Sequence, residues 1–318
     1  MLNLGCPGWN SGRVLDLARR VLDYAPDLVI VYASHNELAG RAMEEGPAAL
    51  PAGEVATVAL HRSALIAWLH RGAAALRSRS RGESLPESQA ALAMAAAAPN
   101  FDPMLLSPEE RRRPSAELER EAAARYSRNL TELAASAHDA GVPAVFVLPV
   151  ANLWYPPSYS VHEGDVDIAA FDQQLERIQE AYGAGRLEAA LQLLDQAVTR
   201  SPRFAMVRYW RGVVAAELGR GDVAREEMQA AIDLDVVTSR LTSAQTTAFL
   251  TAMAATDSTW VDLRPAFHGD VGTEHARRLF LDQVHPTVEG HTLIARELEH
   301  TVLPLLAAEQ EGERDTSI

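Results

Sequence analysis

The chain has 318 residues, of which 47% are hydrophobic and 23% are charged, with a formal net charge of −14 at pH 7 and a pI near 5.2. This length fits one large domain or two ordinary ones with a sizeable buried core. The acidic balance disfavours a nucleic-acid partner, because phosphate binding needs clustered Lys and Arg, and no apolar run is long enough to span a bilayer. The composition therefore predicts a soluble globular chain.

The first part of the chain combines short apolar runs with loops and one helix. Leu2–Leu4 is a candidate strand, and a Gly- and Pro-rich loop follows it. Apolar residues then recur at helical spacing from a cap at Asn10 or Ser11 until Pro26 ends the helix. The run DLVIVYASHNE at 27–37 is apolar and β-branched before it turns polar, which is typical of a strand buried on both faces. Loop, helix and buried strand together indicate an α/β fold.

The rest of the chain extends this alternation after an irregular stretch. Residues 38–114 show little periodicity, apart from a helix expected near Ser63 to Arg77 and an Ala-rich, Pro-bounded segment at 85–99. The later predicted elements are a long helix from Ser115 to Ala140, a buried strand within 142–153 and a strand at 259–263. This order predicts a parallel sheet with helices on both faces.

Residues 171–238 interrupt the alternation, because they are helical with an internal period of 34 residues. The positions that recur are Gly185 and Gly219, Ala190 and Ala224, and Ala197 and Ala231. This is the length of the tetratricopeptide repeat, whose small residues let two helices pack closely and whose unit closes with a proline. The first unit has that proline at Pro202, whereas the second has Val236. Chance spacing in an alanine-rich chain is the alternative explanation.

Two such repeats bury too little surface to be stable alone, since about three are usually needed. We therefore expect the helical insertion, bounded at 166–240, to pack against an α/β domain that occupies 1–165 and 241–308. Its helices would present a groove to a protein partner. The acidic end of the chain, 309–318, is expected to be a disordered tail.

Three polar loops follow predicted strands and are candidates for one shared cleft. They contain Gly5, Gly8 and Asn10; Ser34, His35, Asn36 and Glu37; and Asp282 and His285. Functional residues of parallel α/β sheets gather where the carboxyl ends of the strands open into loops. An imidazole can accept and return a proton near neutral pH, and a carboxylate on the same loop can fix its tautomer. The alternatives are that His285 fills a loop before a helix started by Pro286, and that Asn36 caps a turn.

These loops resemble a known family. NLGCPGWNSG at 3–12, PDLVIVYASHNE at 26–37 and LFLDQVHPTVEGH at 279–291 are similar to the second, third and fifth conserved blocks of the SGNH (GDSL-type) hydrolases. LPVANLWYPP at 148–157 resembles a segment of a bacterial branch of that family that carries a tetratricopeptide insertion. The resemblance covers the α/β portion and the insertion, but not 38–114.

The resemblance implies a fold and a set of roles. The fold would be a three-layer flavodoxin-like parallel sheet with strand order 2-1-3-4-5. Gly8 would give a backbone N–H and Asn36 a side-chain amide to an oxyanion hole, with His285 as general base and Asp282 as its orienting acid. The substrate would be a small-molecule or carbohydrate O-acyl ester, with no metal or cofactor. Relatives of this branch often carry an export signal or membrane anchor.

The family's nucleophilic serine belongs to a block that would precede Leu2, together with the first, central strand of the sheet. Ser34, Ser11 and Cys6 are poor substitutes, because Ser34 shapes the loop before Asn36 and Ser11 suits a helix cap. We therefore interpret the chain as an N-terminally truncated hydrolase that lacks its nucleophile, in preference to an evolved pseudoenzyme.

Several further residues were assigned from the sequence. Tyr155, Pro156 and Pro157 either line the substrate pocket or form a plain turn, His35 and His291 are interpreted as surface or structural residues, and Trp210 is assigned to repeat packing. The alternative function is a scaffold or binding protein, in which the repeats bind a partner and the hydrolase-like domain is inert.

Overall fold

The structure, a computed structural model, describes residues 2–6, 8–38, 116–158, 160–162, 167–236 and 239–315. The described residues all belong to one compact unit, which comprises Met1–Arg41 and Met104–Ile318. The α/β part and the helical insertion therefore belong to one unit. The helix expected near Ser63 to Arg77 and the segment 85–99 lie outside the described residues.

Three short strands form a parallel sheet, as the alternating pattern predicted. They are β1 (Val29–Tyr32), β2 (Ala144–Leu148) and β3 (Thr259–Asp262), in the order β1-β2-β3. In this register Val31, Phe146 and Trp260 lie side by side across the sheet. All three strands therefore open into loops at the same edge, which is where the candidate residues were expected.

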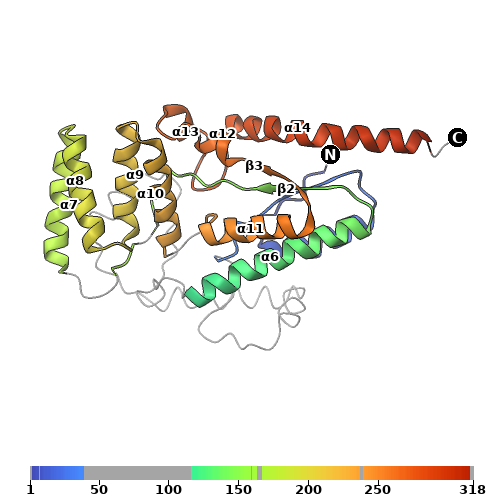
Figure 1. Ribbon diagram of the computed structural model, residues 1–318, viewed down its shortest axis with the longest axis horizontal. Coiled ribbons are helices and arrows are strands. Elements are labelled where there is room, and N and C mark those ends of the chain that lie inside the picture. The colour runs from blue at the N-terminus through green and yellow to red at the C-terminus, as the bar shows by residue number, and fades with distance from the viewer. Residues whose placement is uncertain are drawn as a thin grey trace, which may run out of the picture. The chain divides into compact units, whose positions relative to one another are not determined.

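Helices cover both faces of the sheet. One face packs against α1 (Ser11–Leu22), α6 (Ala116–Asp139) and α11 (Ser243–Thr256), which enclose a core with Val31, Phe146 and Leu148. The other face, with Val145, Val147 and Val261, packs against α12 (Arg264–His268) and α14 (Val288–Asp315). Figure 1 shows α6 and α11 on one side of β2 and β3 and α14 on the other. This part of the molecule is thus a small parallel sheet between helices.

Local signals begin α1 and end α6 where the sequence predicted, whereas α1 ends at Leu22, before the predicted stop at Pro26. The Asn10 side chain accepts a hydrogen bond from the Arg13 N–H at the start of α1. Gly141 adopts a φ of +69° after α6, and the Val142 N–H closes the turn onto the Ala137 carbonyl at 2.9 Å. A non-glycine residue is strained at this φ, so the glycine permits the chain to turn directly into β2.

The prediction of a strand at Leu2–Leu4 is wrong. These residues form no strand, and Leu2 and Leu4 are 86% and 46% exposed. A strand needs a neighbour to accept and donate its backbone hydrogen bonds, and a short apolar run without one gains nothing from the extended conformation. The apolar pattern alone was therefore insufficient to predict a strand at Leu2–Leu4.

The last helix is longer than the sequence suggested. After α13 (Glu274–Arg278), α14 runs to Asp315, into the stretch 309–318 for which a disordered tail was predicted. Its residues Leu293, Ile294 and Leu298 pack on the sheet. The sheet-facing part of α14 therefore fixes the position of the loop that precedes it.

The helical insertion consists of two helix pairs. They are α7 (Ile168–Gly183) with α8 (Leu187–Arg200), and α9 (Ala205–Glu217) with α10 (Gly221–Leu234). Figure 1 shows these four helices packed side by side. Gly185 and Gly219 hold φ values of +71° and +73° in the turn within each pair. The spacing of 34 residues thus places the same left-handed turn in both repeats.

The small residues of the repeats lie at helix crossings. Ala190, Ala197 and Ala224 are completely buried between helices. At Gly212, an added Cβ would come within 2.6 Å of the Met228 Cγ and 3.1 Å of the Ala224 carbonyl oxygen. The helices approach each other too closely there for any larger side chain, which is the physical reason for the repeat pattern.

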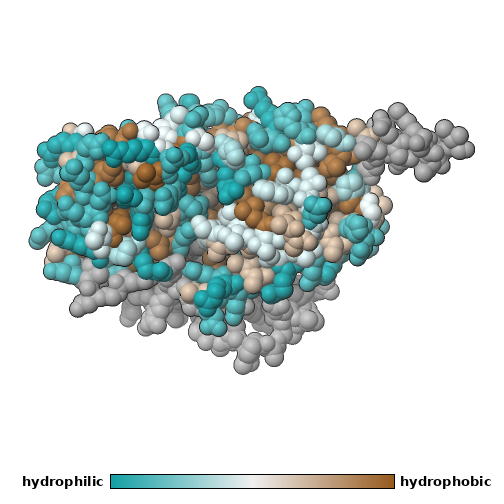
Figure 2. Space-filling view, viewed as in Figure 1, coloured by the Kyte–Doolittle hydropathy of each residue, from teal (hydrophilic) through white to brown (hydrophobic). Residues whose placement is uncertain are grey.

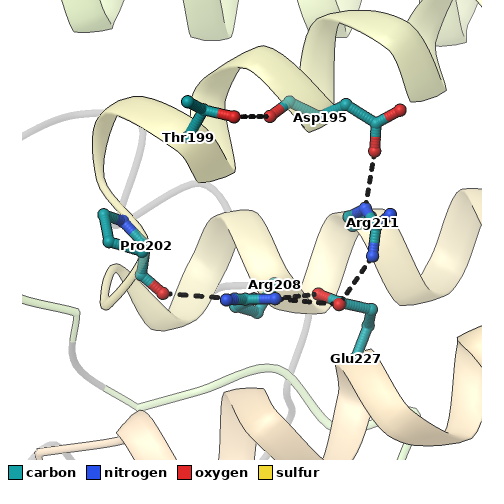
Figure 3. A network of polar contacts seen from close by, with 6 residues as sticks. All are labelled: Asp195, Thr199, Pro202, Arg208, Arg211 and Glu227. Carbon is teal, nitrogen blue, oxygen red and sulfur yellow. Dashed lines mark hydrogen bonds and ion pairs between the residues drawn. The ribbon is translucent and has the colours of Figure 1, made fainter.

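An ionic network joins the two repeats (Figure 3). Arg211 pairs with Asp195 of α8 at 2.7 Å and with Glu227 of α10 at 2.6 Å. Arg208 donates to both carboxylate oxygens of Glu227, at 2.9 and 3.1 Å, and to the Pro202 carbonyl. Two guanidinium groups thereby neutralise a buried carboxylate, which fixes α8, α9 and α10 in one arrangement.

The repeat pair packs against the α/β part, as expected for a pair that cannot be stable alone. Tyr209 and Val213 of α9 share a buried cluster with Leu153, which follows β2, and with Val271. The Trp154 side chain packs against this cluster, and its Nε1–H donates to the Val271 carbonyl at 2.8 Å. The second repeat is therefore continuous with the core beside the carboxyl end of β2.

Candidate functional site

A tight turn between α13 and α14 positions Asp282 and His285. The His285 Nδ1 lies 2.6 Å from the Asp282 Oδ2, while the Asp282 Oδ1 accepts hydrogen bonds from the N–H groups of Val284 at 2.9 Å and His285 at 2.8 Å. Phe280 and Pro286 form an isolated antiparallel bridge that closes the turn. Both carboxylate oxygens are thus occupied, one with the turn and one with the imidazole.

The charge state of Asp282 follows from these contacts. Partial burial raises the pKa of the carboxyl group, but the backbone N–H groups of Val284 and His285 and the His285 side chain outweigh it, so the pKa of Asp282 lies below its usual range. An ionised carboxylate only accepts hydrogen bonds, so the His285 Nδ1 carries the proton. The Nε2 of the neutral ring is then an acceptor, on a side chain that is 69% exposed.

The turn after β1 presents Asn36. Its Nδ2 donates to the Trp9 carbonyl at 3.3 Å, so it lies against the loop that contains Gly8. Gly8 has a φ of +75°, and no atom lies within 4 Å of the position that a Cβ would occupy. The two predicted hydrogen-bond donors therefore come from adjacent loops, with open space beside the glycine.

His35 lies next to Asn36 in the turn after β1. Both nitrogens of its ring are buried and have no hydrogen-bond partner among the described residues. Burial is the main cause that lowers the pKa of His35 to about 4; His285 and Arg240 contribute in the same direction, and the Asp282 charge opposes them. The Asp282 turn is hydrogen-bonded to the loop after β2, and the Asn36 turn follows the parallel neighbour β1, so both turns lie at the carboxyl edge of the sheet. The four predicted site residues thus come from three loops on one side of the sheet.

The serines near these loops are not placed to give a proton to His285. The N–H and hydroxyl of buried Ser11 donate to the Glu37 carboxylate at 2.6 and 2.9 Å, and Asn129 donates to the Ser11 Oγ at 2.8 Å. The Oγ of Ser34 is buried. Ser11 therefore joins α1 to the turn after β1, and burial raises the pKa of Glu37.

The sequence did not single out Asn152, which lies in the loop after β2. Its Nδ2 donates to the Asp282 carbonyl at 2.9 Å, and its N–H donates to the Gln283 carbonyl at 2.9 Å. The signals in the sequence were its position at the carboxyl end of a predicted buried strand and its place within the segment 148–157 that resembles the family branch. In the same loop, burial and then the Asp282 charge raise the pKa of Tyr155, so this predicted pocket residue also lies near the turn.

A cavity of about 320 Å³ is lined by the segment Pro149–Ala151 after β2 and by residues of other elements, but by no residue of this turn. Its lining includes Pro149, Gln229, Thr246, Thr247, Arg264 and His268. The His268 Nε2 lies 2.9 Å from the Ala151 carbonyl oxygen, and Arg264 pairs with Asp262. None of the four predicted site residues lines the cavity, and the Gln229 side chain there donates to the Leu241 carbonyl.

The described residues show neither a metal-binding cluster nor a membrane-spanning helix. No three His, Cys, Asp or Glu side chains there form a group that could hold a metal ion. None of the helices in that part of the chain is long and apolar enough to cross a membrane.

Comparison with known protein families identifies the helical insertion. The family model described as tetratricopeptide repeat matches residues 175–235. Residues 175–235 are a tetratricopeptide repeat segment. A search of curated proteins and of solved structures gave no significant match.

A tetratricopeptide repeat suggests binding to a protein partner, because such repeats present extended surfaces formed by successive helices. In this chain the face of α9 with Tyr209 and Val213 is covered by the loop after β2. Figure 2 shows mostly hydrophilic side chains over the outer tetratricopeptide helices, with separate hydrophobic residues between them. A partner of this surface would therefore be recognised largely by polar contacts.

Proposed function

We propose that this chain carries the base, the orienting acid and the oxyanion hole of an SGNH-type serine esterase that acts on a small-molecule or carbohydrate O-acyl ester. The observation that carries the proposal is the contact of 2.6 Å between the His285 Nδ1 and the Asp282 Oδ2, in a turn at the carboxyl edge of the sheet. The tetratricopeptide segment agrees with the bacterial branch that the loops resemble. In this proposal β1, β2 and β3 are the last three strands of a flavodoxin-like sheet.

In the proposed reaction, the His285 Nε2 takes the proton of a serine hydroxyl while the serine oxygen attacks the ester carbonyl carbon. The carbonyl electron pair moves to its oxygen, which accepts hydrogen bonds from the Gly8 N–H and the Asn36 side chain. Collapse of the intermediate expels the alcohol, which receives the proton from His285. Water then repeats the sequence on the acyl-serine and releases the acid.

The Asn36 amide can serve this role without losing its present contact. An amide nitrogen carries two hydrogens, and one of them donates to the Trp9 carbonyl. The second hydrogen is left for the oxyanion. The bond to Trp9 then orients the amide plane, as an oxyanion hole requires.

The nucleophile is the part that the described residues do not provide. Ser11 is held by Glu37 and Asn129, and the Ser34 hydroxyl is buried. The proposal therefore requires a serine from another segment, which in the resembling family belongs to the strand–helix unit before the block at 3–12.

The test is to join a serine-bearing strand–helix unit of about 30–50 residues, taken from the family consensus, ahead of Leu2 and to assay hydrolysis of p-nitrophenyl acetate. We expect hydrolysis in the extended chain, with little or none in the present one. His285→Ala should lower the rate by a factor of about 10² or more, since it removes the general base. Asp282→Asn should also lower it, because the amide no longer fixes the proton on Nδ1.

His291→Ala is the matched control, since His291 is an exposed histidine at the start of α14. The control should keep the activity of the extended chain. Hydrolysis that is equal with and without His285→Ala would show that the proposed site does not catalyse the reaction.

A binding function is the second candidate, because the tetratricopeptide match itself suggests a protein partner. It would be favoured if the extended chain folds, contains the serine and still hydrolyses no ester. A partner should then be captured by photo-crosslinking groups placed on α7 and α8, and not by groups placed on α14.

A further inference from the structure

The tetratricopeptide pair holds the loop after β2 at several backbone positions. The Tyr209 hydroxyl donates to the Trp154 carbonyl at 2.7 Å, and Arg240 donates to the Tyr155 carbonyl at 2.7 Å. The Asp235 carboxylate, at the end of α10, accepts a hydrogen bond from the Ser158 N–H at 2.8 Å. Residues 152–158 are therefore attached to the repeat pair and are not a free loop.

The ion pair behind these contacts is buried. Arg240 and Asp235 are 2.9 Å apart, with side chains that are 3% and 1% exposed. The Arg277 guanidinium lies 3.7 Å from the centre of the Trp154 ring, on the other side of the loop. A buried, hydrogen-bonded ion pair has one preferred geometry, so it transmits the position of α10 to the loop.

The same loop holds the Asp282 turn through one side chain. Asn152 accepts a hydrogen bond from the Trp154 N–H at 3.0 Å on its Oδ1 and donates through its Nδ2 to the Asp282 carbonyl at 2.9 Å. Its own N–H donates to the Gln283 carbonyl at 2.9 Å. The amide of this buried residue is thus fixed at both ends, between the loop and the turn.

We propose that Asn152 is a positioning residue, through which the tetratricopeptide pair fixes the turn that keeps Asp282 on the His285 Nδ1. The inference rests on the proposed function, in which the opposite nitrogen of that ring is the base. Asn152 lies in the loop after β2, contacts the backbone of the turn and touches no reacting atom. The repeats are accordingly part of the support of the site, in addition to any partner that they bind.

The experiment measures which ring nitrogen of neutral His285 carries the proton, by proton–nitrogen correlation spectra of the imidazole in the full chain. In the unmodified chain we expect the proton mainly on Nδ1. The quantity compared is the tautomer ratio, which is the population with the proton on Nδ1 divided by the population with the proton on Nε2. Asn152→Ala should lower this ratio by about fivefold, the effect of one hydrogen bond. Asn152→Asp keeps the acceptor for the Trp154 N–H and loses the donor to Asp282, so it should act in the same direction and serves if the alanine variant does not fold.

Two matched controls distinguish a positioning role from general destabilisation: Asn129→Ala for Asn152→Ala, and Tyr182→Phe for Tyr209→Phe. Asn129→Ala removes an amide hydrogen bond to Ser11, and Tyr182→Phe removes a hydroxyl bond to Glu217 within the repeats. Neither should change the ratio. Tyr209→Phe, which removes only the hydroxyl that holds Trp154, should shift the ratio in the same direction as Asn152→Ala, by a smaller factor.

An unchanged ratio in both Asn152 variants, or an equal change in the two controls, would overturn the inference. The outcome is independent of the ester assay. If the Asn152 variants shift the ratio but the extended chain hydrolyses no ester, the positioning role stands and the esterase is rejected. If the extended chain is active but the Asn152 variants leave the ratio unchanged, the esterase stands and the positioning role is rejected.

Discussion

His35 shows how a single residue at this site departs from its ordinary chemistry. Its ring nitrogens are buried without a hydrogen-bond partner among the described residues, and burial together with the charges of His285 and Arg240 lowers its pKa to about 4. The ring is therefore neutral at physiological pH. The sequence interpretation of His35 as a surface or structural residue left both possibilities open, and the burial of its ring nitrogens agrees with the structural one.

His35→Gln tests the charge state of this residue. The unfolded chain protonates His35 near its ordinary pKa of 6.5, whereas the folded chain does so only near pH 4. Between these values the unfolded state binds more protons, so the free energy of unfolding falls as the pH decreases. Between pH 7 and pH 5 the variant should lose about 1–2 kcal/mol less stability than the unmodified chain, measured by urea unfolding.

His138→Gln, at an exposed position of α6, is the control. It should lose as much unfolding free energy between pH 7 and pH 5 as the unmodified chain. If His35→Gln shows the full loss of stability between pH 7 and pH 5, then His35 is not the buried neutral group inferred here.

At the scale of the elements, the repeat helices depend on close approach. Gly212 lies where α9 crosses α10, and the Met228 and Ala224 atoms nearest to it leave no room for a Cβ. Gly183 ends α7 with no atom within 4 Å of the corresponding position. The two glycines therefore differ in the space around them, although both lie in repeat helices.

Gly212→Ala should lower the free energy of unfolding by about 1–3 kcal/mol, because the added methyl group forces α9 and α10 apart. Gly183→Ala is the matched control and should leave stability unchanged or raise it by up to about 1 kcal/mol, since alanine loses less backbone entropy in a helix. Urea denaturation of both variants is the measurement. Equal stability of the two variants would show that the crossing is looser than the structure indicates.

At the scale of the whole molecule, the junction between the repeats and the α/β part is both apolar and ionic. Tyr209, Val213 and Leu153 supply the buried apolar contact, and Arg240 with Asp235 supplies a buried ion pair beside it. Breaking one partner of such a pair leaves an uncompensated charge in the interior. An exposed pair such as Arg19 and Glu132, which joins α1 to α6, leaves no such charge behind.

Arg240→Met should therefore destabilise the chain by about 3–5 kcal/mol, whereas Arg19→Ala should cost about 1 kcal/mol or less. Adding Asp235→Asn to Arg240→Met removes the isolated charge and should recover part of the loss. Urea unfolding followed by tryptophan fluorescence would report it, since Trp154 lies at the junction. Similar costs for Arg240→Met and Arg19→Ala would mean that the junction pair is solvated.

Features that depend on neighbours in the sequence were determined by the sequence itself. Asn10 and Gly141 mark helix ends through contacts within a few residues, and Gly185 and Gly219 set the same turn in each repeat. The pairing of Asp282 with His285 also belongs here, because the two residues share one turn and are three positions apart. Local backbone geometry brings such groups together whatever the rest of the chain does.

Features that join distant segments were decided only by the tertiary structure. Asn152 and Asp282 are 130 positions apart, and Arg240 and Tyr155 are 85 apart, so no local pattern in the chain relates them. Leu2–Leu4 shows the converse, since an apolar run became no strand where no neighbouring strand received its hydrogen bonds. Hydrogen bonds between remote segments form only after the sheet and the repeats have packed and excluded water. The Asp282–His285 turn could therefore be predicted from the sequence, whereas the contact of Asn152 with this turn could not.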